Sequence, residues 1–92
     1  TEIEECLLSH PAVAEAGVIG KPDAQRGTIV KAFVRLASGF IGDASLTEEL
    51  RAHVRNKLAS YKAPREIDYV DEFPMTSSGK INRKALRQAE GN

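Results

Sequence analysis

The sequence predicts a small α+β domain in which helices flank a three-stranded, mainly antiparallel sheet, with the element order α-β-β-α-β-α. Two segments, 1–10 and 45–58, carry apolar residues at helical spacing after capping-box signals. Three others, 12–19, 28–36 and 66–73, show the alternation or β-branched content of strands. The 92 residues, 41% of them hydrophobic, suffice for one compact core and should bury roughly 60–65% of the unfolded surface.

The first predicted helix begins at Thr1, because Thr1 and Glu4 have the spacing of a capping box. Cys6 lies among its apolar residues, and we interpret it as a core residue and not as a nucleophile. Pro11 disfavours helical geometry at His10, so the helix should end there and leave His10 as a surface or capping histidine. A single cysteine excludes an internal disulfide and suits a reducing compartment.

Two strands follow, over residues 12–19 and 28–36, separated by a loop over 20–27 that carries Arg26 near its tip. The second strand alternates between an apolar face and a face that includes Lys31, so it should be half-buried. The apolar face consists of Val30, Ala32, Val34 and Leu36.

The second helix, 45–58, is predicted to begin at Ser45, which forms a second capping-box pattern with Glu48. With neither a second histidine close to His53 nor a cysteine cluster, the sequence predicts no metal site. The apolar stripe of this helix is formed by Leu46, Leu50, Val54 and Leu58. The opposite face, predicted to be solvated, carries Glu48, Arg51, Arg55 and Asn56.

A rigid, basic turn covers residues 61–65, and the third predicted strand covers 66–73 and stops at Pro74. The last helix, 82–90, has Asn82 as its predicted N-cap. The 13 Lys and Arg residues balance the 13 Asp and Glu residues, which argues against a general affinity for nucleic acid or anionic membranes. No apolar run approaches the roughly 18 residues of a transmembrane helix, and no signal peptide opens the chain.

The most informative segment is 74–87, where small hydroxyl residues and a glycine precede a lysine and a basic helix. The turn Thr76–Gly79 is predicted to be flexible and to present Lys80 to a phosphate. A P-loop is excluded, because that motif requires a glycine five residues before Gly79, where this chain has Pro74. The ordinary interpretation of an isolated Gly-Lys pair is a solvated loop before a basic helix.

This segment resembles the C-terminal lysine motif of the adenylate-forming superfamily, which includes acyl- and aryl-CoA synthetases, adenylation domains of peptide synthetases and luciferases. The usual form of the motif is Pro-Lys-Thr-x-Ser-Gly-Lys-Ile-x-Arg-x-x-Leu-Arg. Met75 replaces the first lysine, which weakens any role for position 75 and leaves Lys80 untouched. The residues that fit are Pro74, Thr76, Ser78, Gly79, Lys80, Ile81, Arg83, Leu86 and Arg87.

Further motifs extend the resemblance over essentially the whole chain. Residues 1–4 resemble the end of the Gly-Tyr-Arg-Ile-Gly-Pro-x-Glu-Ile-Glu motif, and residues 7–13 match Leu-x-x-His-Pro-x-Val. Residues 22–27 match a Pro-Asp-x-x-Arg-Gly loop, 30–34 its following strand, and 61–65 a Tyr-Lys-x-Pro-Arg turn. That turn, together with Ser-Gly-Lys-Ile, is typical of acetyl- and medium-chain acyl-CoA synthetases.

The resemblance implies an AMP-forming acid-thiol ligase. A carboxylate attacks the α-phosphorus of Mg-ATP, with the Mg²⁺ held mainly by another domain, and the thiol of coenzyme A then displaces AMP. By the same resemblance, Lys80 is the catalytic cation of the first step. The loop beside the nucleotide is formed by Thr76, Ser78 and Gly79, and the contacts to coenzyme A are implied for Arg26, Arg55, Ala63, Pro64 and Arg65.

On this interpretation, residues 1–92 are the C-terminal domain of an acyl-CoA synthetase whose large N-terminal adenylation domain and hinge are absent from the chain. We expect the chain alone to be inactive, and to act with that domain on ATP, coenzyme A and a small carboxylic acid, without nucleic acid. The expected compartment is the cytoplasm or, alternatively, the mitochondrial matrix. Two alternatives remain: a peptide-synthetase-type adenylation domain that loads a carrier protein, and a non-catalytic binding module.

Overall fold

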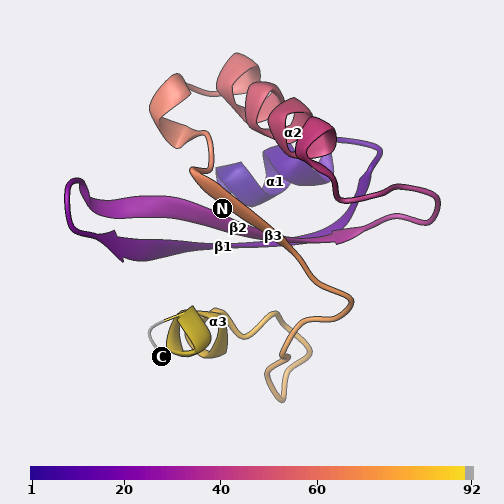
Figure 1. The fold of residues 1–92 in the computed structure, drawn as a ribbon. Helices are drawn as coiled ribbons and strands as arrows, with labels where there is room; N and C mark the ends of the chain where they lie inside the picture. The colour runs from indigo at the N-terminus through magenta and orange to yellow at the C-terminus, as the bar shows by residue number, and fades with distance from the viewer. Residues whose placement is uncertain (91–92) are drawn as a thin grey trace.

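The computed structural model describes residues 1–90, which form three α-helices and one three-stranded sheet (Figure 1). The element order is the predicted one, with a short 3-10 turn, η1, before the third strand. The elements are α1 (Glu2–Leu8), β1 (Val13–Asp23), β2 (Gly27–Leu36), α2 (Ala44–Lys57), η1 (Ser60–Lys62), β3 (Glu66–Tyr69) and α3 (Arg83–Glu90).

The sheet has the strand order β1-β2-β3 and is mixed, whereas the sequence predicts a mainly antiparallel sheet. β1 and β2 form an antiparallel hairpin, as predicted, but β3 lies parallel to β2, with Ile67 opposite Ala32. The chain passes through α2 between β2 and β3, and a helical crossover of this kind is what parallel neighbours require. The predicted helix between the two strands was therefore the signal for a parallel pair.

Helices cover both faces of the sheet: α1 and α2 lie on one side and α3 lies on the other (Figure 1). Because helices cover both sides, the middle of β2 is buried on both of its faces, and the prediction of a half-buried strand is wrong. Ala32 and Val34 face α1 and α2, whereas Phe33 joins the core under α3. Lys31, predicted on a solvated face, is only 3% exposed. The core under α3 consists of Ile19, Phe33, Phe73 and Leu86.

The helix caps are partly as predicted. Asn82 is confirmed as the cap of α3, because its Oδ1 accepts a hydrogen bond from the backbone N–H of Ala85 at 3.0 Å. The predicted start of α2 at Ser45 is wrong. Asp43 is the N-cap, and its Oδ1 accepts from the N–H of Leu46 at 2.8 Å. Aspartate and serine are about equally good caps, so propensity alone did not separate the two positions.

Two strand limits differ from the predicted ones by more than one residue. β1 extends to Asp23, through the first half of the predicted loop 20–27, because the hairpin closes in a tight turn at Gly27, whose φ is 79°. β3 ends at Tyr69 and not at Phe73. Beyond Tyr69 the chain leaves the sheet and crosses to the α3 side, where Phe73 is buried.

Cys6 is buried, as predicted, with 8% of its surface exposed. His10, predicted at the surface or as a cap, is also buried. Its Nδ1 accepts from the N–H of Ala12 at 3.0 Å, and its Nε2 lies 2.5 Å from Oε2 of Glu49 on α2. His10 therefore links the end of α1 to α2.

Helix α3 approaches the sheet closely at Gly17 of β1. A Cβ atom at this position would lie 3.2 Å from Cδ1 of Leu86 and 3.2 Å from Cε1 of Phe73, which is tighter than an ordinary contact. It would also lie 3.4 Å from Cγ2 of Ile81, in the segment that leads into α3. The absence of a side chain at Gly17 thus lets α3 and the segment before it rest directly on the sheet.

Candidate functional site

Residues 75–81, here called the lysine loop, form a closed turn on the α3 side of the sheet (Figure 1). Met75 and Ile81 pair in an isolated antiparallel bridge at the base of the loop. Inside the bridge, the N–H of Thr76 donates to the carbonyl of Lys80 at 2.7 Å. The N–H of Gly79 donates to the carbonyl of Thr76 at 3.0 Å. The loop is therefore a miniature hairpin that carries the candidate catalytic lysine just before its closing bridge.

The three small residues predicted beside the nucleotide hold this hairpin together. Oγ1 of Thr76 accepts from the N–H of Lys80 at 3.1 Å and lies 3.0 Å from Oγ of Ser78. Gly79 has a φ of 84°, a conformation that a residue with a Cβ adopts only with strain. The sequence predicts a flexible turn here, but the structure shows an internally hydrogen-bonded one.

Lys80 is exposed to solvent. None of the ion pairs formed within residues 1–90 includes its ammonium group. The backbone of the loop is ordered by its own hydrogen bonds, while the side chain at its end stays available. A compact positive charge on a long stem, presented in this way, is suited to an anionic group delivered from outside the domain.

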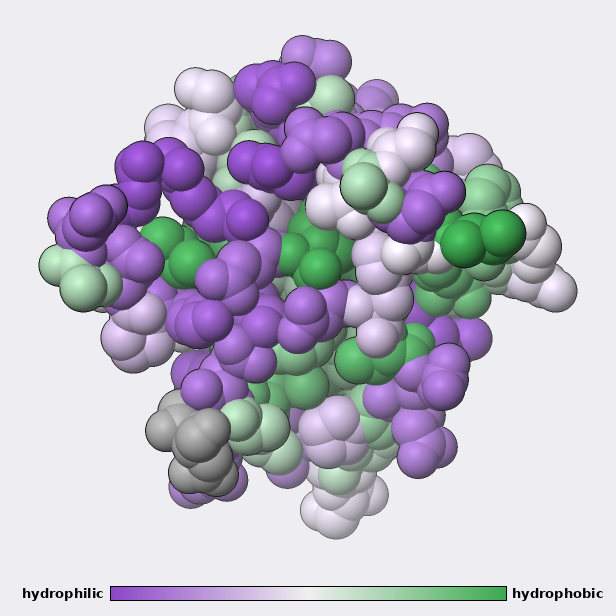
Figure 2. Space-filling model, in the orientation of Figure 1, coloured by the Kyte–Doolittle hydropathy of each residue, from purple (hydrophilic) through white to green (hydrophobic). Residues whose placement is uncertain are grey.

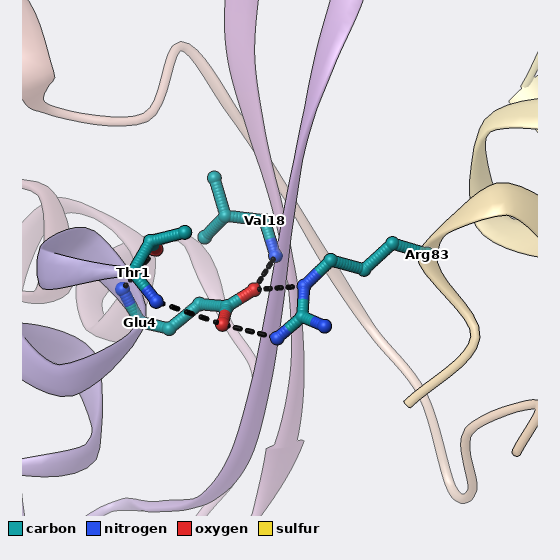
Figure 3. A network of polar contacts seen from close by, with 4 residues as sticks. All are labelled: Thr1, Glu4, Val18 and Arg83. Carbon is teal, nitrogen blue, oxygen red and sulfur yellow. Dashed lines mark hydrogen bonds and ion pairs between the residues drawn. The ribbon is translucent and has the colours of Figure 1, made fainter. Parts of the chain in front are cut away.

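The first residue of α3, Arg83, anchors the base of the lysine loop to α1 (Figure 3). Its Nε donates to Oε2 of Glu4 at 2.7 Å, and its Nη2 donates to Oε1 of the same carboxylate. Glu4 also accepts from the N–H of Val18 at 2.8 Å and completes the predicted capping box with Thr1. Only the fit of Arg83 to the motif was visible in the sequence. The partner lies 79 positions away, and nothing local indicates it.

Burial of Glu4, which is 5% exposed, by itself favours the neutral carboxylic acid. The hydrogen bonds from Arg83 and from the N–H of Val18 outweigh that effect and hold the pKa of Glu4 below its ordinary value. The same pair raises the pKa of Arg83. Both groups are therefore charged throughout the neutral range.

Because the pKa of Glu4 is lowered in the folded state, its stabilising effect should be present above the ordinary value of 4.5 and disappear as the pH falls through the lowered value. Acid unfolding monitored by circular dichroism between neutral and acidic pH should show this loss. Glu4→Gln should be less stable at neutral pH and lose less stability on acidification. Glu5→Gln, on an exposed neighbour, separates this effect from the removal of any α1 carboxylate. Equal acid sensitivity of the wild type and Glu4→Gln would contradict the assignment.

The other end of α3 is held by a buried lysine. Nζ of Lys31 lies 2.7 Å from Oε1 of Glu90 and 2.9 Å from Oδ2 of Asp68. Burial disfavours the charged lysine, but the hydrogen bonds to Glu90 and Asp68 outweigh it and raise the pKa of Lys31. Lys21 joins the cluster at 3.1 Å from Glu90. α3 is thus tied by ion pairs to α1 at its start and to the sheet at its end.

A second candidate site is a depression of about 290 Å³ beside the hairpin turn and η1, here called the arginine depression. Figure 2 shows mostly hydrophilic side chains over this end of the molecule. Four of the five residues predicted to contact coenzyme A line it together, whereas the fifth, Pro64, is fully buried and does not. The lining includes Arg26, Arg51, Arg55, Tyr61, Ala63 and Arg65.

Arg51 was not among the predicted site residues, because the sequence places it on a solvated helix face. Its Nη1 donates to Oε1 of Glu48 at 2.7 Å, while its buried Nε has no hydrogen-bond partner within residues 1–90. The sequence did contain one indication that Arg51 belongs to the same site as Arg55. The two residues are four positions apart in a predicted helix and therefore share one helix face.

A further depression, of about 360 Å³, lies at the opposite end of β2 and is lined by none of the predicted residues. Within residues 1–90, no three His, Cys, Asp or Glu side chains are grouped to hold a metal ion. None of the helices in that range is both long and apolar enough to cross a membrane.

The fold and these two sites define a small α+β domain that presents one lysine on a closed loop and, separately, an arginine-lined depression. The chain belongs to the AMP-binding enzyme C-terminal domain family, whose model matches residues 2–80. Among curated relatives, the acetyl-coenzyme A synthetase of Bacillus subtilis is 53% identical over 99% of this chain. The human mitochondrial acyl-coenzyme A synthetase ACSM1 is 48% identical over 97% of it.

Solved structures show the same relationship. A crystal structure of an acyl-CoA synthetase from Brucella canis superposes with a TM-score of 0.95 at 56% identity, over 98% of this chain and 17% of that one. The amide bond synthetase McbA from Marinactinospora thermotolerans superposes with a TM-score of 0.87 at 36% identity, over 96% of this chain and 17% of that one. This chain spans only 16% of the length of each of the two curated relatives.

Proposed function

We propose that this chain is the C-terminal domain of an AMP-forming carboxylate-CoA ligase. In this proposal it supplies Lys80 to acyl-adenylate formation and binds the phosphates of coenzyme A at the arginine depression. The observation that carries it is the exposed ammonium of Lys80 on an ordered loop, which forms no ion pair within residues 1–90. The two curated relatives named above are an acetyl- and an acyl-coenzyme A synthetase. The proposal implies that the domain acts together with ATP, coenzyme A and a larger N-terminal domain.

In the first half-reaction, a carboxylate oxygen bonds to the α-phosphorus of ATP, and the bond from that phosphorus to the bridging oxygen of pyrophosphate breaks. Two anionic groups approach each other, and negative charge shifts toward the leaving group. The Lys80 ammonium would lie between the carboxylate and the α-phosphate and lower the energy of that charge distribution. Mg²⁺ enters with ATP and would be held mainly by the N-terminal domain.

In the second half-reaction, the thiol of coenzyme A attacks the acyl carbon, releases its proton and displaces AMP. Lys80 has no required part in this step. The phosphates of coenzyme A would instead bind Arg26, Arg55 and Arg65 in the arginine depression, where guanidinium groups suit phosphate oxygens.

The lysine loop and the arginine depression lie in different parts of the domain: the loop is on the α3 side of the sheet, and the depression is beside the hairpin turn and η1 (Figure 1). In any single orientation of the domain, only the lysine loop or the arginine depression could therefore face an active site on the N-terminal domain. This separation supports a rotation of the domain between the half-reactions, with Lys80 present in the first and withdrawn in the second.

The decisive experiment uses the full-length enzyme. Pyrophosphate exchange with a panel of carboxylic acids measures acyl-adenylate formation, and thioester formation with coenzyme A measures the second step. Transfer to coenzyme A supports the proposal. Transfer only to a phosphopantetheinylated carrier protein would favour a peptide-synthetase-type enzyme, and transfer only to an amine would favour an activity like that named for McbA. If no acid in the panel supports adenylate formation, the result would favour a non-catalytic binding module.

Arg26→Ala in the full-length enzyme should raise the KM for coenzyme A about tenfold or more, since a hydrogen bond to a charged group contributes about 1.5–3 kcal/mol. The KM for ATP should change little, because the lysine loop is untouched. Steady-state kinetics with each substrate varied in turn provides the measurement. Arg87→Ala, an exposed arginine on α3, is the matched control. An unchanged dependence on coenzyme A would remove Arg26 from the binding site.

A further inference from the structure

The Glu4–Arg83 pair joins the two layers that lie on opposite faces of the sheet. Glu4 belongs to α1 and Arg83 to α3, and their side chains meet at β1 (Figure 3). β1 is an edge strand, so the N–H of Val18 that points away from β2 is free to donate to the same carboxylate. One carboxylate thus fixes α1, the sheet edge and the start of α3 relative to one another.

The base of the lysine loop also makes an apolar contact with the sheet side of the domain. Ile81 packs against the core under α3, which includes Phe73 and Leu86. Apolar contacts hold the base against the sheet, but they are not directional and tolerate tilting. A bidentate guanidinium–carboxylate pair is directional, because its two parallel hydrogen bonds fix both distance and plane. The pair between Arg83 and Glu4 therefore supplies a directional contact next to the base of the loop.

From this geometry, we infer that Arg83 is a positioning residue for Lys80, acting through its paired hydrogen bonds to Glu4. The inference rests on the proposed function, because it assigns Arg83 to the half-reaction that uses Lys80. Only the short segment Ile81–Asn82 separates the lysine from the anchored arginine, and the hydrogen bond from the N–H of Asn82 to the carbonyl of Pro74 at 2.8 Å stiffens it. Tilting at Arg83 is thus transmitted to the ammonium.

The test is made in the full-length enzyme with Arg83→Lys and Glu4→Gln. Lysine keeps a positive charge beside Glu4 but cannot form two parallel hydrogen bonds, and glutamine keeps the shape of Glu4 without its charge. A displacement of about 1 Å can lower a rate about a hundredfold, so kcat for acyl-adenylate formation should fall about ten- to a hundredfold. The KM values for ATP and the acid should stay within about twofold, because the substrates bind mainly elsewhere.

Thioester formation from supplied acyl-adenylate should keep its wild-type rate in both variants. This readout separates positioning from general damage, because a misfolded domain would also lose the arginine depression and slow the second step. Glu90→Gln is the matched control. It loosens the far end of α3, where Glu90 contacts Lys21 and Lys31, and should leave both half-reactions near wild type.

Parallel loss of both half-reactions in Arg83→Lys and Glu4→Gln would overturn the inference in favour of a purely structural pair. So would an unchanged adenylation rate in both variants while Lys80→Ala still lowers the rate of that step about a hundredfold or more. If Lys80→Ala itself leaves adenylation intact, then the proposed function of Lys80 is wrong. That single variant therefore distinguishes a failure of the proposed function from a failure of the positioning role of Arg83.

Discussion

Lys80→Ala in the full-length enzyme should lower the rate of acyl-adenylate formation on the order of a hundred- to a thousandfold, the usual effect of removing one preorganised electrostatic contact. Thioester formation from supplied acyl-adenylate should be unaffected. In the proposed mechanism, the ammonium stabilises charge that develops only while the carboxylate bonds to phosphorus. Pyrophosphate exchange measures the first step, and single-turnover release of AMP with coenzyme A measures the second.

Lys84→Ala is the matched control for this prediction, because Lys84 is an exposed lysine on the first turn of α3 and outside the lysine loop. It should retain both half-reactions, which would show that general loss of positive charge is not the cause. Equal loss of both steps in Lys80→Ala would refute the division of labour between the lysine loop and the arginine depression.

Leu50→Ala should destabilise the domain by about 2–5 kcal/mol, the range for removing a large aliphatic side chain from a well-packed core. Leu50 is 0% exposed and lies on α2 in the core between the helices and the sheet. Urea unfolding of the isolated domain, monitored by circular dichroism, gives the free energy of unfolding. Leu8→Ala removes the same atoms from a residue that is 48% exposed and should cost much less. Similar losses in the two variants would contradict the described core.

Local rules predicted most of the secondary structure. Capping signals located the starts of α1 and α3, and the hairpin followed from two strand-like segments around a polar turn. The same rules failed to predict burial where it depends on residues far apart in the sequence. The burial of Lys31 depends on α3, which covers the face of the sheet opposite α1 and α2. Its ion-pair partners Asp68 and Glu90 come from later parts of the chain. No local pattern around Lys31 contains that information.

The candidate sites were also predictable in part: local motifs indicated single residues, and the fold decided which of them lie together. The motif around Lys80 predicted the lysine loop, and the family resemblance implied contacts to coenzyme A for Arg26, Arg55 and Arg65. Their grouping in one depression is a property of the fold, because they come from the hairpin turn, from α2 and from the turn before β3. Arg51 was missed, since a solvated helix face is the ordinary interpretation of such a residue.

The open edge of β1 has one further consequence. An unpaired edge strand presents free N–H groups that a strand of another molecule can join, which is a common route to aggregation. At Val18 that N–H is already bonded to Glu4, and the ionised Glu4–Arg83 pair occupies the approach. The same two side chains that connect the layers therefore also block the addition of a foreign strand at this point of the edge.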